Sequence, residues 1–126
     1  AQFLQNHKDQ KKFAHVVFKQ GAEPTMQRLQ QMDSDFASLL AQLKQFNYMK
    51  DSVVFIASEQ GAVDTPYYQT KEGKIEHRKP FLFVITQRDV FHKHPSFMMN
   101  LVKNRDNMVT ALDIYETLKT LANLHK

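Results

Sequence analysis

The chain has 126 residues, of which 42% are hydrophobic and 24% charged, and its formal net charge is +4. These values are typical of one globular domain and argue against wholesale disorder. There is no cysteine, which excludes disulfides, thiolate catalysis and thiolate zinc sites. No apolar run approaches the roughly 20 residues of a transmembrane helix, and the polar, basic start contains no visible signal peptide. Because the basic residues form no stripe interleaved with aromatics, we expect no nucleic-acid partner.

The first half of the chain predicts a strand, a helix and a second strand after a lead-in segment, residues 1–12. Phe13–Phe18 is a short, apolar, β-branched run that favours a buried strand. A long helix is expected from Pro24 to a stop at Asn47. Its apolar stripe, at steps of three and four residues, consists of Leu29, Met32, Phe36, Leu39, Leu40, Leu43 and Phe46. The apolar pattern of residues Ser52–Ala57 predicts the second buried strand.

The second half begins with a long polar connection, residues 58–79, of a length that in compact domains is usually functional or disordered. Phe81–Thr86 predicts the third strand. A helical segment is expected around Asp89–Val102, interrupted by the sequence HKHP, and Asn107 is expected to cap a last helix. The inward residues of that helix are expected to be Val109, Leu112, Tyr115, Leu118 and Leu121.

The order of elements is therefore β-α-β-loop-β-α-α, and the fold class is α/β. Two of the strands are continuous apolar runs, which is typical of a sheet with helices on both faces. Three strands and three helices make a thin domain, whose apolar elements require more neighbours than this chain supplies. We therefore expect another protein segment or subunit to complete the sheet.

The turn after the second strand, Ser58-Glu59-Gln60-Gly61, has the layout of a metal-binding turn. A carboxylate stands at the end of a buried strand and is followed by a polar residue and a glycine. Gln60, however, is a poor metal ligand compared with an imidazole. Gly61 is expected to have a positive φ, or to lie where a side chain would clash with the returning loop.

Several stretches, in order, resemble the C-terminal half of a sulfatase-like family in the alkaline phosphatase superfamily, in particular the invertebrate family called domain of unknown function 229. They are DSDFASLLAQLKQFNYMKDSVVFIASEQGA, QTKEGKIEHRKPFLFVI, HPSFMMNLVKN and MVTALDIYETLKTL. The family element Thr-x-x-Gly-x-x-Glu-x-x-x-Pro is present, and so is the pattern of the last helix. The matching residues are Thr70, Gly73, Glu76, Pro80, Thr110, Asp113, Thr117 and Leu118. The resemblance implies that residues 13–126 are the C-terminal part of a sulfatase-like domain with a partial sulfatase-like sheet.

The resemblance also implies a metal-dependent hydrolase of phosphate or sulfate esters, using a divalent ion such as Zn, Ca or Mn, and a secretory or extracellular location. The nucleophile of such enzymes lies in the N-terminal half, which this chain does not include. Where the superfamily has an Asp-His metal pair, this chain has Glu59 and Gln60, with Gly61 retained. A second ligand loop of relatives corresponds to KQGAEP, in which only Glu23 could ligate. Tyr68 occupies a position where relatives place a basic residue against the ester anion.

Because these departures occur together on three loops, we interpret the site as degenerate, with no catalytic residue, no metal ligand and no cofactor. His15 is interpreted as a core or partner-facing residue, and His92 and His94 as exposed residues. The candidate anion-binding or charge-compensating residues are Lys19, Arg78, His77 and Tyr68. In a parallel β-α-β unit, consecutive strand ends lie on one side of the sheet. We therefore expect Glu59 to pair with Lys19, with Arg78 as the alternative and an unpaired, solvent-facing Glu59 as the remaining possibility.

Three functions are compatible with the sequence. The first is a catalytically degenerate sulfatase-like fragment that acts as a structural or binding module, so that an enzyme is not expected. The alternative is part of an active ester hydrolase whose missing half supplies the nucleophile, with Glu59 as an atypical ligand. The third is a small interaction module that uses its basic face.

Overall fold

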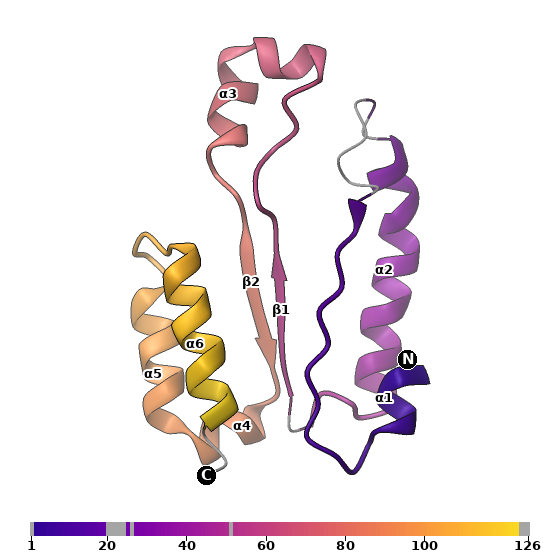
Figure 1. Cartoon of the computed structure of the whole chain (residues 1–126), viewed down its shortest axis with the longest axis vertical. Helices are drawn as coiled ribbons and strands as arrows, with labels where there is room; N and C mark the ends of the chain where they lie inside the picture. The colour runs from indigo at the N-terminus through magenta and orange to yellow at the C-terminus, as the bar shows by residue number, and fades with distance from the viewer. Residues whose placement is uncertain (1, 20–24, 26, 51, 124–126) are drawn as a thin grey trace. The chain divides into compact units, whose positions relative to one another are not determined.

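The computed structural model describes residues 2–19, 25, 27–50 and 52–123, which fall into two compact units, residues 1–87 and 88–126 (Figure 1). The first unit contains α1 (Gln2–Asn6), α2 (Gln27–Gln45), β1 (Val53–Ala57), the 3-10 helix η2 (Pro66–Gln69), α3 (Lys71–His77) and β2 (Leu82–Thr86). The second contains α4 (Arg88–Lys93), α5 (Pro95–Asn104) and α6 (Ala111–Asn123). None of the helices in the described part of the chain is long and apolar enough to span a membrane.

Helix α2 ends as its sequence predicts. Asn47 has a φ of 57°, the left-handed conformation that commonly terminates helices. The Tyr48 N–H donates to the Leu43 carbonyl at 3.0 Å, and the Asn47 N–H donates to the Lys44 carbonyl at 3.1 Å. These bonds satisfy carbonyls that the end of the helix would otherwise leave unpaired. Glu23, which alone in its loop could ligate a metal, and Pro24, the predicted start of this helix, lie outside the described residues.

The sheet is a two-stranded antiparallel hairpin rather than a parallel arrangement. β1 pairs with β2 in a register that runs from Val53 opposite Thr86 to Ala57 opposite Leu82. The predicted β-α-β unit is therefore wrong for the described residues, although the mixed α/β class and the last two predicted strands are confirmed. Two adjacent apolar runs can pair locally across their own connection, and the apolar pattern alone does not specify strand direction.

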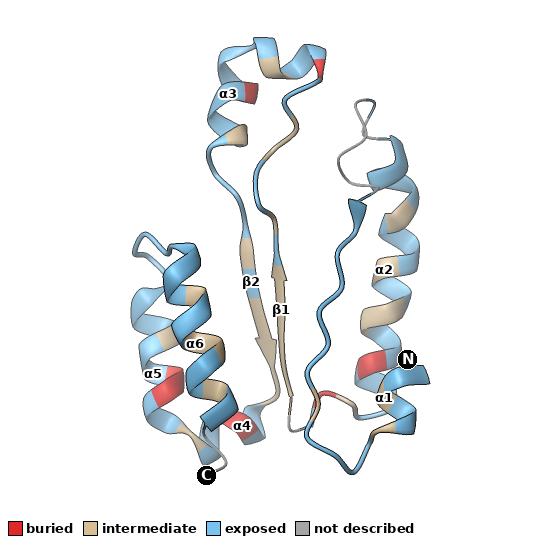
Figure 2. Cartoon of the chain, viewed as in Figure 1, coloured by how far each residue is buried: buried red, intermediate tan, exposed pale blue. Residues whose placement is uncertain are grey.

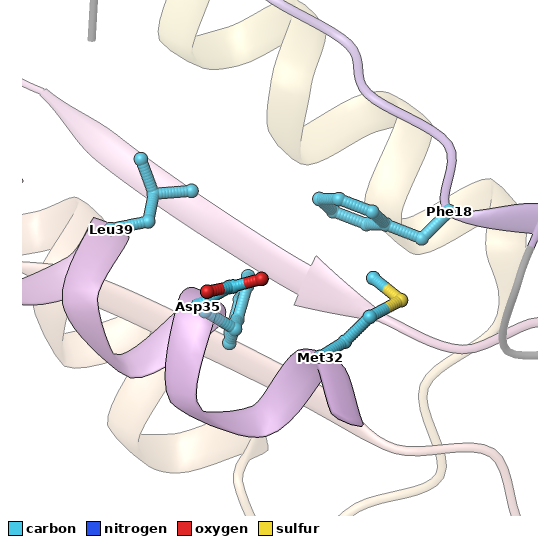
Figure 3. Close-up of a pocket in the computed structure, with 5 residues that line it drawn as sticks. Phe18, Met32, Asp35 and Leu39 are labelled. Carbon is cyan, nitrogen blue, oxygen red and sulfur yellow. The ribbon is translucent and has the colours of Figure 1, made fainter. Parts of the chain in front are cut away.

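Phe13–Phe18 is not a strand, contrary to prediction. A strand requires a neighbour to receive its backbone hydrogen bonds, and this segment has no ladder partner among the described residues. Its side chains are largely exposed, Phe13 to 73%. Its far end packs on α2, where the Phe18 and Phe36 rings meet edge to face at 6.1 Å. Phe18 also lines a shallow apolar groove with Met32, Asp35, Phe36 and Leu39 of that helix (Figure 3).

The break predicted at HKHP is present, because α4 ends at Lys93 and α5 begins at Pro95. Asn107, however, does not cap the last helix. Its side-chain amide donates to the Lys103 carbonyl at 3.2 Å and so belongs to the end of α5. Thr110 and Asp113 form the cap of α6 instead. The Asp113 carboxylate accepts from the Thr110 N–H at 2.7 Å and from its hydroxyl at 2.6 Å.

The predicted inward face of α6 is also partly wrong. Val109, Leu112 and Tyr115 are exposed, whereas Ile114, Leu118 and Leu121 are half-buried. At helical spacing these apolar residues form one wide arc on α6. Ile114, Leu118 and Leu121 lie on its half-buried edge, and Leu112 and Tyr115 lie on its exposed edge, so the prediction placed the inward face too far toward Leu112.

The cap of α6 predicts a pH dependence. Hydrogen bonds from the Thr110 hydroxyl and then from its N–H hold the pKa of Asp113 below its ordinary value of 3.8. A carboxyl whose pKa is lower in the folded than in the unfolded state stabilises the fold above its unfolded pKa and loses this contribution as pH falls through the folded pKa. We therefore expect the amides of Asp113 and Ile114, which bond to Thr110, to lose hydrogen-exchange protection below pH 3.8. In Asp113→Asn this loss with pH should be absent, and an identical pH profile in both proteins would contradict the role of the cap.

Burial is sparse throughout the described residues (Figure 2). The buried apolar side chains are Leu43, Met49, Val90, Phe97 and Met98. No large side chain among the described residues is completely buried. The hairpin strands contain only half-buried or exposed residues. Continuous apolar strands are normally covered on both faces, so this hairpin lacks the cover that its sequence requires.

Candidate functional site

The connection between β1 and β2, residues 58–81, carries the predicted metal turn and the Thr-x-x-Gly-x-x-Glu element. It leaves and re-enters the hairpin at one point. The Ser58 N–H donates to the Phe81 carbonyl at 3.1 Å, and the Phe81 N–H donates to the Ser58 hydroxyl at 2.9 Å. These two bonds extend the ladder by one pair beyond the strands and close the base of the loop.

Gly61 and His77 bridge the loop farther from the hairpin. The Gly61 N–H donates to the His77 carbonyl at 3.3 Å, and His77 Nδ1 lies 2.8 Å from the Gly61 carbonyl oxygen. Because a carbonyl oxygen only accepts, Nδ1 carries the proton and donates. In neutral His77 the other ring nitrogen, Nε2, is then the acceptor. The glycine of the predicted metal turn is therefore in contact with an imidazole.

Tyr68 completes this cluster. Its ring meets the His77 ring edge to face, with centroids 5.3 Å apart, and both side chains are half-buried. The loop thus brings together three of the residues singled out from the sequence: Gly61, Tyr68 and His77. An edge-to-face aromatic pair of this kind stabilises by about 0.5–1.5 kcal/mol beyond its burial.

The Thr-x-x-Gly-x-x-Glu element, residues 70–76, fixes the start of α3 and its packing against η2. The Thr70 hydroxyl accepts from the Gly73 N–H at 3.0 Å, which caps the start of α3, and it donates to the Tyr67 carbonyl at 2.7 Å. Gly73 is buried against η2. A Cβ there would lie 2.7 Å from the Tyr67 carbonyl carbon and 2.9 Å from Tyr68 Cα, so only glycine fits without displacing the backbone.

Glu76, the glutamate of the same element, interacts with the Tyr67 phenol. A hydrogen bond with the Glu76 side chain, and then desolvation and the charges of Glu76 and Glu72, raise the pKa of the Tyr67 phenol above its ordinary value. Thr70, Gly73 and Glu76 therefore all converge on Tyr67. The sequence pattern pointed to the neighbouring Tyr68 and not to Tyr67. The signal available was its place three residues before the threonine that begins the element.

The remaining predicted site residues are not brought together. Glu59, Gln60 and Arg78 are exposed, and Glu59 makes no ion pair with any described residue. Lys19 was expected beside Glu59 because Phe13–Phe18 was predicted to be a parallel strand, and that strand is absent. The pairing of Glu59 with Lys19 or Arg78 stays a prediction without support from strand geometry.

The donor set does not fit the divalent metal that the resemblance implies. Within residues 2–19, 25, 27–50 and 52–123, no three His, Asp or Glu side chains are grouped closely enough to hold an ion. Glu59 and Gln60 are exposed, and Gln60 offers only an amide oxygen. As arranged among the described residues, these side chains do not form the coordination shell of a structural or catalytic metal.

Gly61→Val is expected to lower the free energy of unfolding by about 1–2 kcal/mol, because it overpacks the loop. The φ of Gly61 is not positive, so the second form of the sequence prediction, a clash, is the one confirmed: a Cβ would lie 2.8 Å from His77 Cα. The measurement is the urea midpoint of the variant beside Gln60→Val, an exposed neighbour expected to leave it unchanged. Equal midpoints for wild type and Gly61→Val would show that the bridge does not constrain the loop.

Comparison with known proteins gives a single assignment. The family model described as "Protein of unknown function (DUF229)" matches residues 1–126, the whole chain. Neither the curated proteins nor the solved structures contain a match. A family match over the full length carries more weight than any single motif in the loop, and the chain therefore belongs to the DUF229 family.

Proposed function

We propose that this chain is a non-catalytic part of a sulfatase-like domain and serves as a structural or binding module whose sheet another protein segment or subunit completes. The observation that carries the proposal is the hairpin of β1 and β2. Every residue of both strands is apolar except Thr86, yet none is buried, and Phe83 is 58% exposed. An exposed apolar hairpin with two free edges is marginally stable alone and is a template for further strands.

The accessible surface supports the same proposal. It amounts to 10561 Å² for a mass of 14.8 kDa. A compact monomer of that mass exposes about 7,000 Å², and two separate globules with the masses of the two units would expose roughly 8,300 Å². We propose that a larger domain or a partner covers part of this surface.

The exposed segment Phe13–Phe18 supports a larger sheet of the sulfatase-like kind. It is apolar and without a ladder partner, and α2, the helix that separates it from β1, has 19 residues. A helix of this length is sufficient for the crossover between parallel strands. In the proposed complete domain, this segment becomes a strand when the neighbouring sheet is present. The proposed location of that domain is secretory or extracellular, from the family resemblance.

The proposal of a module without catalysis is supported by the loop itself. Gly61 bonds to His77, and Thr70, Gly73 and Glu76 all serve to hold Tyr67. The residues that a hydrolase would direct at a substrate are occupied in folding the loop. The half-buried Tyr68 supplies no positive charge for an ester anion.

Analytical ultracentrifugation over a range of protein concentrations tests the structural role. We expect the isolated chain to self-associate through its uncovered apolar surface. Phe83→Asp should shift the distribution toward monomer. Phe3→Asp, which alters an exposed phenylalanine outside the sheet, should not. A compact monomer at high concentration with a sharp cooperative melt would overturn the proposal.

The alternative, part of an active ester hydrolase, is favoured by one observation. His77 donates from Nδ1 to a backbone carbonyl and so leaves Nε2 as an acceptor, an arrangement common in metal-ligating histidines. Calorimetric titration of metal-free protein with Zn, Mn, Ca and Mg separates the two functions. The structural proposal expects no stoichiometric binding. Micromolar binding that is lost in both Glu59→Ala and His77→Ala would instead establish the hydrolase hypothesis.

A further inference from the structure

Helix α3 has two chemically different sides. Gly73 is buried against η2, and His77 bonds to Gly61, so these two residues define the inner side of the helix. Lys74, Ile75 and Arg78 lie three, four and seven residues after Lys71, which places all four on a single face. In helical projection this face lies opposite Gly73 and His77. We call these four residues the outer face of α3.

The outer face is positively charged and its cations are available. All four side chains are exposed, and neither the lysines nor Arg78 form an ion pair with any described residue. The acidic residues of the same helix belong to another side. Glu76 and Glu72 raise the pKa of the Tyr67 phenol, which places them near that ring. The short helix therefore carries its cations and its anions on different sides, although both sets are exposed.

We propose that the outer face of α3 is a docking surface for an acidic segment of a protein partner. Ile75, which is 46% exposed, lies at the edge of this face beside Lys71 and Arg78, with Glu72 on its other side. An exposed apolar side chain next to a row of cations can combine an apolar contact, which contributes affinity, with charges that steer association and fix register. The complementary segment carries Asp or Glu residues beside an apolar side chain.

A protein partner fits this face better than a nucleic acid does. The phosphates of a nucleic acid would gain little from Ile75, and a uniformly charged backbone would also meet Glu72 and Glu76 on the adjoining side. An acidic peptide can place its carboxylates opposite the cations alone. The charge complementarity is therefore local to one helix face rather than spread along a groove.

The loop presents this face in a fixed orientation relative to the hairpin. The Ser58–Phe81 and Gly61–His77 pairs hold the two arms of the loop, and Thr70 and Gly73 lock α3 onto η2. A preorganised surface loses less conformational freedom on binding, and this improves affinity. The surface is separate from the exposed hairpin strands of the proposed function, and its test uses different residues.

The test measures binding of a fluorescently labelled peptide of alternating Glu and Leu residues by anisotropy, at about 50 mM salt so that charges are only partly screened. We expect the triple variant Lys71→Glu/Lys74→Glu/Arg78→Glu to weaken binding at least about tenfold, and Ile75→Ala about threefold or more. The control Lys8→Glu/Lys11→Glu/Lys50→Glu makes the same change of net charge at exposed lysines elsewhere. It should weaken binding by less than about twofold, since charges farther than a Debye length are screened.

Three results would overturn the proposal. One is absence of saturable binding by the wild-type chain. Another is an equal loss in the control, which would mean that the peptide responds to net charge alone. The third is a duplex DNA oligonucleotide that binds more tightly than the peptide and is insensitive to Ile75→Ala, which would make the face a nucleic-acid surface. Circular dichroism checks that each variant is folded, and the triple Gln variant at Lys71, Lys74 and Arg78 replaces the Glu variant if the latter unfolds.

Discussion

Replacing Gly73 with alanine is expected to destabilise the chain by about 3 kcal/mol, the upper part of the range for overpacking a filled site. The sign of this effect is informative, because Gly→Ala within a helix ordinarily stabilises by about 0.5–1 kcal/mol. Here the added methyl would press on the backbone of Tyr67 and Tyr68, and backbone cannot rotate away as a side chain can. Either α3 or η2 must move, and the movement would break the Thr70 cap.

The matched control is Lys74→Ala, one residue farther along α3 and on its exposed outer face. It removes no contact with another described residue, and alanine is a slightly better helix former than lysine, so we expect a change within about 0.5 kcal/mol. Both free energies are measured by urea denaturation. A Gly73→Ala protein as stable as Lys74→Ala would mean that α3 and η2 are not packed as described.

Met98→Ala is expected to lower the stability of residues 88–126 by about 3 kcal/mol, within the range for large-to-small changes at buried methionines. Met98 is 7% exposed and belongs, with Val90 and Phe97, to the few buried residues of that unit. A small unit with so few buried side chains has little stability to lose. Its helices should therefore melt at a markedly lower temperature in the variant.

The adjacent residue supplies the control. Met99 is the same residue type on the same helix, but it is 72% exposed. Met99→Ala should change stability by less than about 0.5 kcal/mol. The loss is followed by the thermal midpoint of helical circular dichroism, and by exchange protection of α5 amides. Equal effects of the two substitutions would show that burial in this unit differs from that described.

Local signals predicted local structure well. The stop at Asn47 and the break before Pro95 were both correct, because each depends on the conformational preference of a residue and not on distant partners. The strand at Phe13–Phe18 and the parallel sheet were wrong. An apolar run indicates that a segment prefers burial, but it does not identify the segment that packs against it. Strand pairing is decided by contacts that are distant in sequence.

For the candidate site too, predictions were correct where the constraint is local and incomplete where it depends on contacts between elements. Gly61 was singled out correctly as a close-approach glycine, because a strand that turns sharply constrains its own neighbours. Tyr67 was missed because its place three residues before Thr70 gains meaning only once α3 packs against η2. Lys19 was placed beside Glu59 only through the assumed direction of a strand; without that strand among the described residues, the predicted pair stays a prediction without structural support.

The bonds between Ser58 and Phe81 have a consequence for how this family can change. They bring the two ends of residues 59–80 to neighbouring positions of a continuous ladder, so the hairpin needs nothing from the loop except that its ends meet. The entropy of closing a loop rises only slowly with its length. Insertions, deletions or wholesale exchange of this segment would therefore cost the strands little. The loop can therefore be treated as an exchangeable insertion. A two-residue Asn-Gly turn could replace it in the hairpin. The excised segment could be grafted between the strand ends of an unrelated hairpin, where it would keep its own internal hydrogen bonds.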